Sequence, residues 1–156
     1  MDEASITRRY RFAAAHRLHT PVLSDEENRR VFGKCNNPNG HGHNYVLLVT
    51  VRGPVDPETG RVTEVETLDR IVTETVVARY DHQDLNHMPE YVHLVTTGEN
   101  LVQVIWDMLV DRIPVGRLEK IGLIETRDNY FEYTGGPRAQ PTAAREQATA
   151  CVQRNH

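Results

Sequence analysis

Apolar and polar positions in the first half of the chain predict two long strands with a short helix between them. Residues 5–15 have strand character, and Ile6, Tyr10 and Phe12 would share one face of that strand. An apolar run opens a second strand over residues 46–55. Between the strands, Ser24 and Glu27 have the spacing of a capping box, which predicts a helix from there to about Phe32.

The second half of the chain changes to helical spacing and then returns to strands. Apolar residues recur every three to four positions over residues 66–79 and again over 99–112, so both segments predict amphipathic helices. Residues 118–126 and 130–134 predict two more strands joined by a polar turn. The expected order is ββααββ, an α+β fold in which one antiparallel sheet carries both helices on one face.

Composition limits the classes to which the protein can belong. With 156 residues the chain can form one domain with its own core, which we expect at residues 5–134, followed by a flexible tail at 135–156. The net charge of −4 argues against a nucleic acid or an acidic membrane as partner. No apolar run approaches the roughly 20 residues of a membrane span, the N-terminus lacks a signal peptide's apolar core, and the two distant cysteines suit a reducing compartment. We therefore expect a cytoplasmic protein.

The most concentrated chemistry lies between Cys35 and Tyr45, where the second strand begins. Side chains two positions apart on a strand point the same way, so His41 and His43 would present both imidazoles on one side. His16 ends the first strand, and pairing of the two strands would bring it close to them. A lone His-x-His pair is common, but three imidazoles with an open fourth position are typical of a catalytic zinc site. The chain has no Cys-x-x-Cys, which excludes a thiolate-rich structural site.

Three further polar residues are candidates for a site. Asp81 and His82 lie in a polar segment that, taken alone, is more simply a surface loop, and adjacent side chains are not expected to bond each other. Glu125 continues the apolar face of the third strand, where a carboxylate needs a partner unless it has reached solvent at the strand end.

Thr96 and Glu99 have the spacing of a second capping box at the start of the last helix.

Together these motifs resemble the 6-pyruvoyl-tetrahydropterin synthase family. The resemblance spans about residues 5–134, and the motifs that carry it are residues 12–19, residues 35–45, Asp81-His82, residues 97–100 and Glu125-Thr126. It implies the tunnelling fold, in which the sheets of three subunits join into a barrel and two trimers stack as a homohexamer. It also implies a reaction of tetrahydrobiopterin biosynthesis, in which 7,8-dihydroneopterin triphosphate becomes 6-pyruvoyl-tetrahydropterin and triphosphate is released.

The resemblance gives a role to each residue of the predicted metal and catalytic site. It implies a Zn²⁺ ion on the three histidines, where the metal would acidify the C–H bonds of the substrate side chain. Cys35 would be the base that removes those protons. Asp81 and His82 would come from a neighbouring subunit and complete the catalytic group around this cysteine.

Other residues would hold the substrate. Glu125 would accept two hydrogen bonds from the pterin ring, and Thr97 and Glu99 would add contacts from the N-terminus of the last helix. The triphosphate needs cations, for which the candidates are Arg17, Arg29, Arg30 and Lys34.

Three alternatives remain open at this point. 6-Carboxy-tetrahydropterin synthase, of deazapurine (queuosine) biosynthesis, usually has the shorter motif Cys-x-x-x-His-Gly-His, whereas here five residues separate Cys35 from His41. Retro-aldol cleavage to a hydroxymethyl pterin occurs in relatives in which a glutamate replaces or joins the cysteine. A non-catalytic zinc- or pterin-binding oligomer would not need Cys35, Asp81 and His82 together with Glu125.

Overall fold

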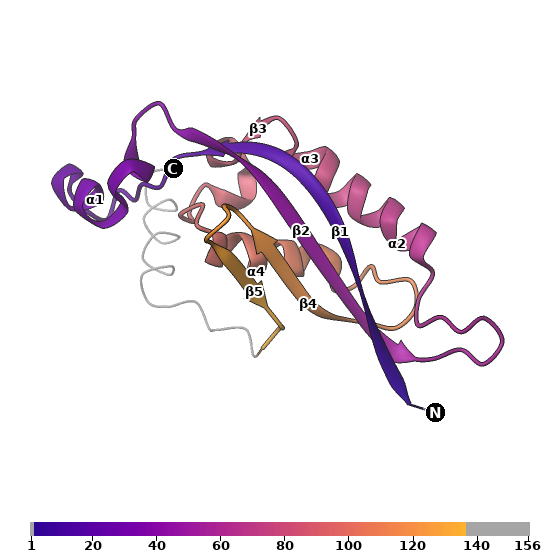
Figure 1. Ribbon diagram of the computed structural model, residues 1–156. Coiled ribbons are helices and arrows are strands. Elements are labelled where there is room, and N and C mark those ends of the chain that lie inside the picture. Colours follow the sequence, from indigo (N-terminus) through magenta and orange to yellow (C-terminus); the bar gives the residue numbers. More distant parts are fainter. Residues whose placement is uncertain (1, 137–156) are drawn as a thin grey trace, which may run out of the picture.

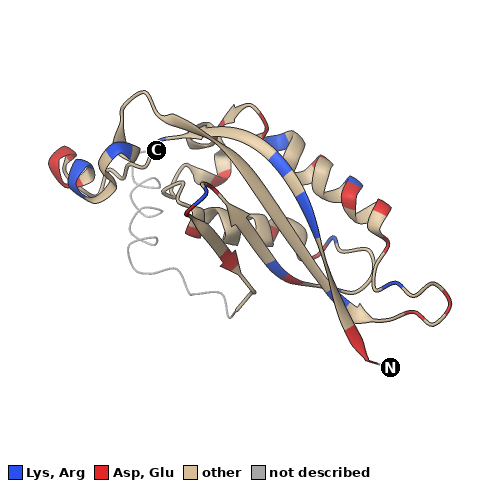
Figure 2. Cartoon of the chain, viewed as in Figure 1, with Lys and Arg blue, Asp and Glu red and all other residues tan. Residues whose placement is uncertain are grey.

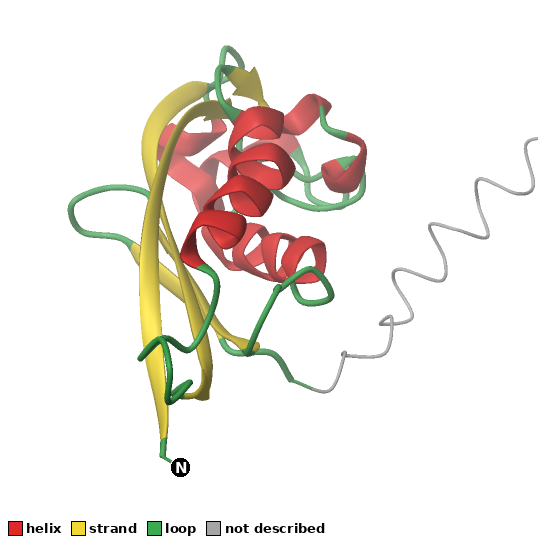
Figure 3. Ribbon diagram, turned by 90° about the vertical axis from the view of Figure 1, so that its right-hand side faces the viewer, coloured by secondary structure: helices red, strands yellow, loops and turns green. Residues whose placement is uncertain are grey.

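The computed structural model describes residues 2–136, which form one five-stranded sheet with the longer helices packed on one of its faces and the short helix Asp25–Phe32 beyond its end. Figure 3 shows these helices on one side of the sheet, while the other side carries no helix of the described chain. The strands run in the order β3-β1-β2-β4-β5. Their bounds are β1 Glu3–His16, β2 His41–Pro54, β3 Gln83–Asp84, β4 Arg117–Ile124 and β5 Tyr130–Tyr133. The α+β architecture with both long helices on one face is therefore confirmed.

The sheet is built around β1 and β2, which pair antiparallel over their whole length, from Glu3 opposite Pro54 to His16 opposite His41. Alternate side chains of β2 are fully buried from Tyr45 to Val51. The second strand thus begins at His41, five residues before its predicted start. Sequence pattern missed this extension because the paired segment contains glycine and polar residues, and pairing with β1 decides its conformation.

The helices differ from their predicted bounds at several points. They are α1 Asp25–Phe32, α2 Val65–Val72, α3 Ala78–Tyr80 and α4 Gly98–Leu109, with a π-helix at Thr73–Val77 and 3₁₀ turns at Gly33–Asn36, Leu85–His87 and Pro89–Tyr91. The single helix expected over residues 66–79 is therefore interrupted by one π turn. The short strand β3, which pairs parallel with β1, lies in a segment expected to be a loop.

Helix capping confirms one prediction and corrects another. Ser24 caps α1 with the reciprocal Glu27 bond of a capping box, as predicted. The box expected between Thr96 and Glu99 is wrong, because Thr97 caps α4 by accepting a hydrogen bond from the Asn100 N–H. The shift of one position leaves the Thr96 carbonyl available to a different partner.

The core lies between the sheet and the apolar faces of α2 and α4. Leu68 on α2 and the α4 residues Leu101 and Ile105 have no exposed surface. The start of α4 approaches β5 so closely that a Cβ atom on Gly98 would overlap the Phe131 ring. These contacts hold the N-terminus of α4 against the end of the sheet at which the histidines gather.

Figure 2 shows that Lys, Arg, Asp and Glu occur in the helices, along β1 and in the loops. Within residues 2–136, no helix combines the length and the apolar character that crossing a bilayer requires. The tail predicted at residues 135–156 falls outside the described residues except for Gly135 and Gly136, and Cys151 lies there too.

Candidate metal and catalytic site

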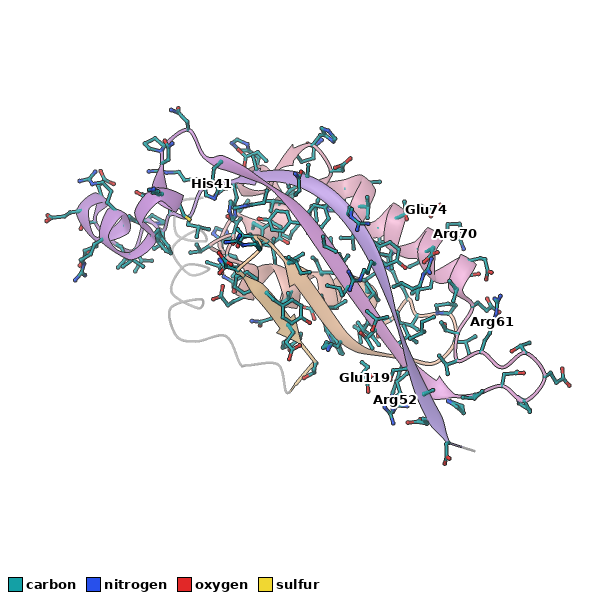
Figure 4. All side chains as sticks on the ribbon, viewed as in Figure 1. His41, Arg52, Arg61, Arg70, Glu74 and Glu119 are labelled. Atoms are coloured by element: carbon teal, nitrogen blue, oxygen red, sulfur yellow. The ribbon has the colours of Figure 1, made fainter. Side chains whose placement is uncertain are left out.

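Three histidines from β1 and β2 meet at one end of the sheet. His16 pairs directly with His41, and His43 follows on the same face of β2, so their ligand nitrogens all lie within 4.8 Å of one another. The Nε2 atoms of His16 and His41 are 3.1 Å apart. Figure 4 labels His41 at the end of β2 that lies nearest α1. The expectation that strand pairing brings the three imidazoles together is confirmed.

Burial favours the neutral form of two of the three imidazoles, those of His16 and His43. Burial lowers the pKa of both His16 and His43. The Thr96 carbonyl can only accept, so His16 Nδ1–H donates to it at 2.7 Å and the Nε2 lone pair is left on the side of the cluster, 3.1 Å from His41 Nε2. His43 Nε2 and His41 Nδ1 are buried without a hydrogen-bond partner. A divalent metal that prefers nitrogen ligands fits this donor set.

The loop that carries Cys35 is bonded to the chain just after the end of β1, at the same end of the sheet as the histidines. Cys35 sits in the 3₁₀ turn that follows α1, and its carbonyl accepts a hydrogen bond from the Leu18 N–H at 2.8 Å. The Asn36 side chain donates to the Leu18 carbonyl at 2.7 Å and fixes the same loop. The thiol is free and partly exposed. The loop therefore folds back beside the histidine-bearing end of β1, as expected from its turn residues.

Asp81 and His82 form a contact that sequence reasoning did not expect. The His82 Nδ1 and Asp81 Oδ2 atoms are 2.9 Å apart, so adjacency does not keep the two side chains from bonding. Asp81 accepts from the Ala13 N–H at 2.8 Å, and this bond, followed by His82, lowers the pKa of the Asp81 carboxyl. His82 has a φ of 60°, a left-handed conformation that its N–H bond to the Ala13 carbonyl helps to hold.

The His82 imidazole reaches solvent, whereas the Asp81 carboxylate stays bonded to β1. The His82 side chain is 82% exposed. Among the described residues, neither Asp81 nor His82 makes a hydrogen bond with Cys35. The pair lies at the edge of β1 that pairs with β3, where His82 lines a pocket of about 510 Å³ together with Gly42 and His43.

Glu125 faces the histidine cluster from the first position after β4. Its carboxylate Oε1 lies 3.7 Å from His16 Nε2 and 3.8 Å from His43 Nε2, and its side chain is only 11% exposed. The Asn129 amide donates to the other carboxylate oxygen at 3.4 Å. The alternative of a strand-end glutamate in solvent is therefore wrong, because the carboxylate turns inward.

The N-terminus of α4 completes this end of the molecule. Thr96 is fully buried and binds His16 through its carbonyl. Thr97 caps the helix, and Glu99 is exposed in the first turn. Sequence reasoning missed Thr96 as a residue of the site, because its contribution is a backbone carbonyl that any residue could supply.

A pocket of about 710 Å³ opens beside Cys35. Three of the four predicted phosphate-binding cations line it, whereas Arg30 does not. The full lining is Arg17, His19, Asp25, Arg29, Gly33, Lys34, Asn36, Asn37 and Pro38. Arg17 Nε donates to the Asn36 carbonyl at 3.0 Å, which holds its guanidinium against the Cys35 loop.

The sequence and the fold match one family of proteins. The family model of 6-pyruvoyl tetrahydropterin synthase matches residues 5–136. The chain is 46% identical to the Homo sapiens protein named 6-pyruvoyl tetrahydrobiopterin synthase, over 85% of this chain and 92% of the human protein. It is 43% identical to the Drosophila melanogaster protein of the same name, over 85% of this chain and 80% of that protein.

A solved structure gives the same result for the fold. The structure of the Caenorhabditis elegans 6-pyruvoyl tetrahydropterin synthase superposes with a TM-score of 0.83 at 38% identity, and the match covers 87% of this chain and 98% of that one. The Plasmodium falciparum structure, at 16% identity and a TM-score of 0.62, shares the fold. The chain belongs to the 6-pyruvoyl tetrahydropterin synthase family.

Proposed function

We propose that this protein converts 7,8-dihydroneopterin triphosphate to 6-pyruvoyl-tetrahydropterin with release of triphosphate, as a zinc-dependent lyase of tetrahydrobiopterin biosynthesis. The observation that carries the proposal is the cluster of His16, His41 and His43 at the end of β1 and β2 to which the Cys35 loop folds back. The names of the human and Drosophila relatives support this choice of reaction. The reaction combines proton removal, elimination and an internal tautomerisation, so it needs no external oxidant.

The histidine cluster would hold one Zn²⁺ ion. When bound, the ion supplies Lewis acidity that polarises the oxygens of the substrate side chain and acidifies the adjacent C–H bonds. The hydrogen bond from His16 Nδ1 to Thr96 fixes that imidazole's tautomer and orientation before any ligand arrives. Burial keeps His16 and His43 neutral, the form in which an imidazole binds a metal.

Cys35 would take the proton from the substrate, and the Asp81–His82 pair of a neighbouring subunit would hold and relay protons. This assignment is supported by the outward presentation of the pair, which is bonded to β1 through Ala13 and exposed at its imidazole. A homohexamer built as a dimer of trimers would bring such a pair to each Cys35 loop, because a closed ring repeats one interface at every subunit.

The substrate would lie between Glu125 and the 710 Å³ pocket. Glu125 is the carboxylate for the pterin ring, and Thr97 and Glu99 add contacts from the start of α4. The triphosphate would enter the pocket, where Arg17 and Lys34 can offset its negative charge. We place the reaction in the cytoplasm, where a free Cys35 thiol remains reduced.

Release of triphosphate tests the proposal. Zinc-loaded protein should release triphosphate from 7,8-dihydroneopterin triphosphate, chelation should stop the release, and added zinc should restore it. The Cys35→Ala variant should bind zinc and release triphosphate far more slowly. Release that is unaffected by both chelation and Cys35→Ala would contradict the proposal.

A further inference from the structure

Among the described residues four tyrosines are buried, and one of them differs from the others. The hydroxyls of Tyr10, Tyr80 and Tyr91 have partners: Tyr10 donates to Asp69 at 2.7 Å, and those of Tyr80 and Tyr91 are 3.0 Å apart. The Tyr45 side chain has no exposed surface, and its hydroxyl has no hydrogen-bond partner. A buried hydroxyl without a hydrogen-bond partner lowers stability, so packing alone would favour phenylalanine at this position.

The Tyr45 ring is held directly beneath the histidine cluster. It pairs with Phe12 on β1 and stacks on that ring, with centroids 5.1 Å apart and planes inclined by 23°. Its centroid lies 5.5 Å from that of His43 and 6.3 Å from that of His16. These contacts fix the position of the ring, so the hydroxyl at its end is also fixed.

Glu125 follows the last residue of β4 that pairs with β2. The β2–β4 register ends with Val46 opposite Ile124, and its next step places Tyr45 opposite Glu125. A phenolic hydroxyl can donate one hydrogen bond to a carboxylate.

The Glu125 carboxylate also has fewer hydrogen bonds than its burial requires. Its only hydrogen bond within the described chain is the 3.4 Å contact from Asn129, although its side chain is 11% exposed. A nearly buried carboxylate needs several donors to offset its lost hydration. Continuing the β2–β4 register by one step thus sets a buried donor without an acceptor opposite a carboxylate whose other near neighbours are the imidazoles of His16 and His43, at 3.7 and 3.8 Å.

We propose that Tyr45 is a positioning residue for Glu125: its hydroxyl donates a hydrogen bond to the Glu125 carboxylate when that carboxylate binds the pterin ring. This inference rests on the proposed function, in which Glu125 accepts the donors of the ring. A hydrogen bond from the rigid phenol would fix the orientation of the Glu125 carboxylate. The side chain would then lose less conformational freedom when it binds the pterin ring. Phenylalanine would fill the same space without this bond.

The test compares two Tyr→Phe variants that keep the ring. Tyr45→Phe should weaken binding of neopterin, a non-reactive pterin without the triphosphate, by roughly tenfold, since a hydrogen bond to a charged group is lost. Zinc content should not change, and the melting temperature should be equal or higher. Tyr10→Phe is the matched control, because its hydroxyl bonds Asp69 away from the site. It should lower the melting temperature and leave neopterin affinity unchanged.

A double-mutant cycle shows whether Tyr45 acts through Glu125. In the Glu125→Gln background, Tyr45→Phe should have almost no further effect on neopterin affinity. The inference would be overturned if Tyr45→Phe weakened neopterin binding equally in the wild type and in the Glu125→Gln background. It would also be overturned if Tyr45→Phe did not weaken neopterin binding in the wild type. If Glu125→Gln weakens binding and Tyr45→Phe does not, the proposed role of Glu125 stands alone. If Glu125→Gln itself has no effect, that role and this inference both fail.

Discussion

Two inactive variants should restore activity to each other if the catalytic group is shared between subunits. Within one chain, the Cys35 carbonyl bonds to Leu18, and the His82 backbone bonds to Ala13. Leu18 and Ala13 are five positions apart, so these two anchors can be at most roughly 17 Å from each other. Among residues 2–136, no hydrogen bond joins Cys35 to Asp81 or His82, as expected if the two halves of the catalytic group come from different chains.

The recovery expected from subunit exchange follows from ring symmetry. A working site needs an intact Cys35 from one chain and an intact His82 from the next. After random mixing of equal amounts of Cys35→Ala and His82→Ala chains, roughly a quarter of the interfaces receive both intact residues. The mixture should therefore regain roughly a quarter of wild-type activity, while each variant alone stays nearly inactive.

The two variants are mixed under mild denaturation and refolded, and native mass spectrometry confirms that mixed oligomers have formed. The activity of the mixture is then compared with that of the wild type. A mixture of Cys35→Ala with Cys35→Ala/His82→Ala is the control, and it should recover nothing because no intact thiol is present. Absence of recovery in confirmed mixed oligomers of the two single variants would refute the shared site and place the whole catalytic group in one chain.

Three further predictions concern the metal, the base and stability. His43→Ala should lose most of its zinc by metal analysis, and full occupancy would exclude His43 as a ligand. Cys35→Ala should keep its zinc, whereas zinc loss would make the thiol a fourth ligand. Glu90→Gln should lower the free energy of unfolding by about 2 kcal/mol at pH 7, because the Arg79 pair, 2.7 Å at both contacts, holds the pKa of Glu90 at about 2. A carboxyl whose pKa is lowered in the folded state stabilises the fold at pH values above its ordinary pKa of 4.5. The difference in unfolding free energy between Glu90→Gln and wild type, measured by urea titration, should therefore shrink as the pH falls from 4.5 towards 2. A loss of unfolding free energy in Glu90→Gln that is as large at pH 2 as at pH 7 would contradict this role of the Glu90 charge.

The sequence was sufficient to predict the elements with strong periodicity and the site that depends on them. Alternation along β1 and β2 predicts a shared face, and pairing of the two strands places His16 opposite His41. The capping box at Ser24 is a local interaction within one turn, so local sequence specifies it. In each case the interaction that decides the structure lies within a few residues or follows from strand pairing.

Features decided by contacts between distant segments were missed. The Asp81–His82 contact depends on a left-handed His82, whose N–H bonds the Ala13 carbonyl far away in sequence. The inward turn of Glu125 after β4 depends on the β4–β5 turn and on the histidine cluster. The roles of Thr96 and Tyr45 became visible only from burial and hydrogen-bond partners. Periodicity carries no information about such pairings.

Product identification tests the proposed reaction most directly. Zinc-loaded protein incubated anaerobically with 7,8-dihydroneopterin triphosphate should yield 6-pyruvoyl-tetrahydropterin by mass spectrometry, together with free triphosphate. A 6-carboxy-tetrahydropterin or a hydroxymethyl pterin as the main product would assign the protein to another reaction of the same fold. Substrate recovered unchanged, from protein whose zinc content and oligomeric state are verified, would contradict the account.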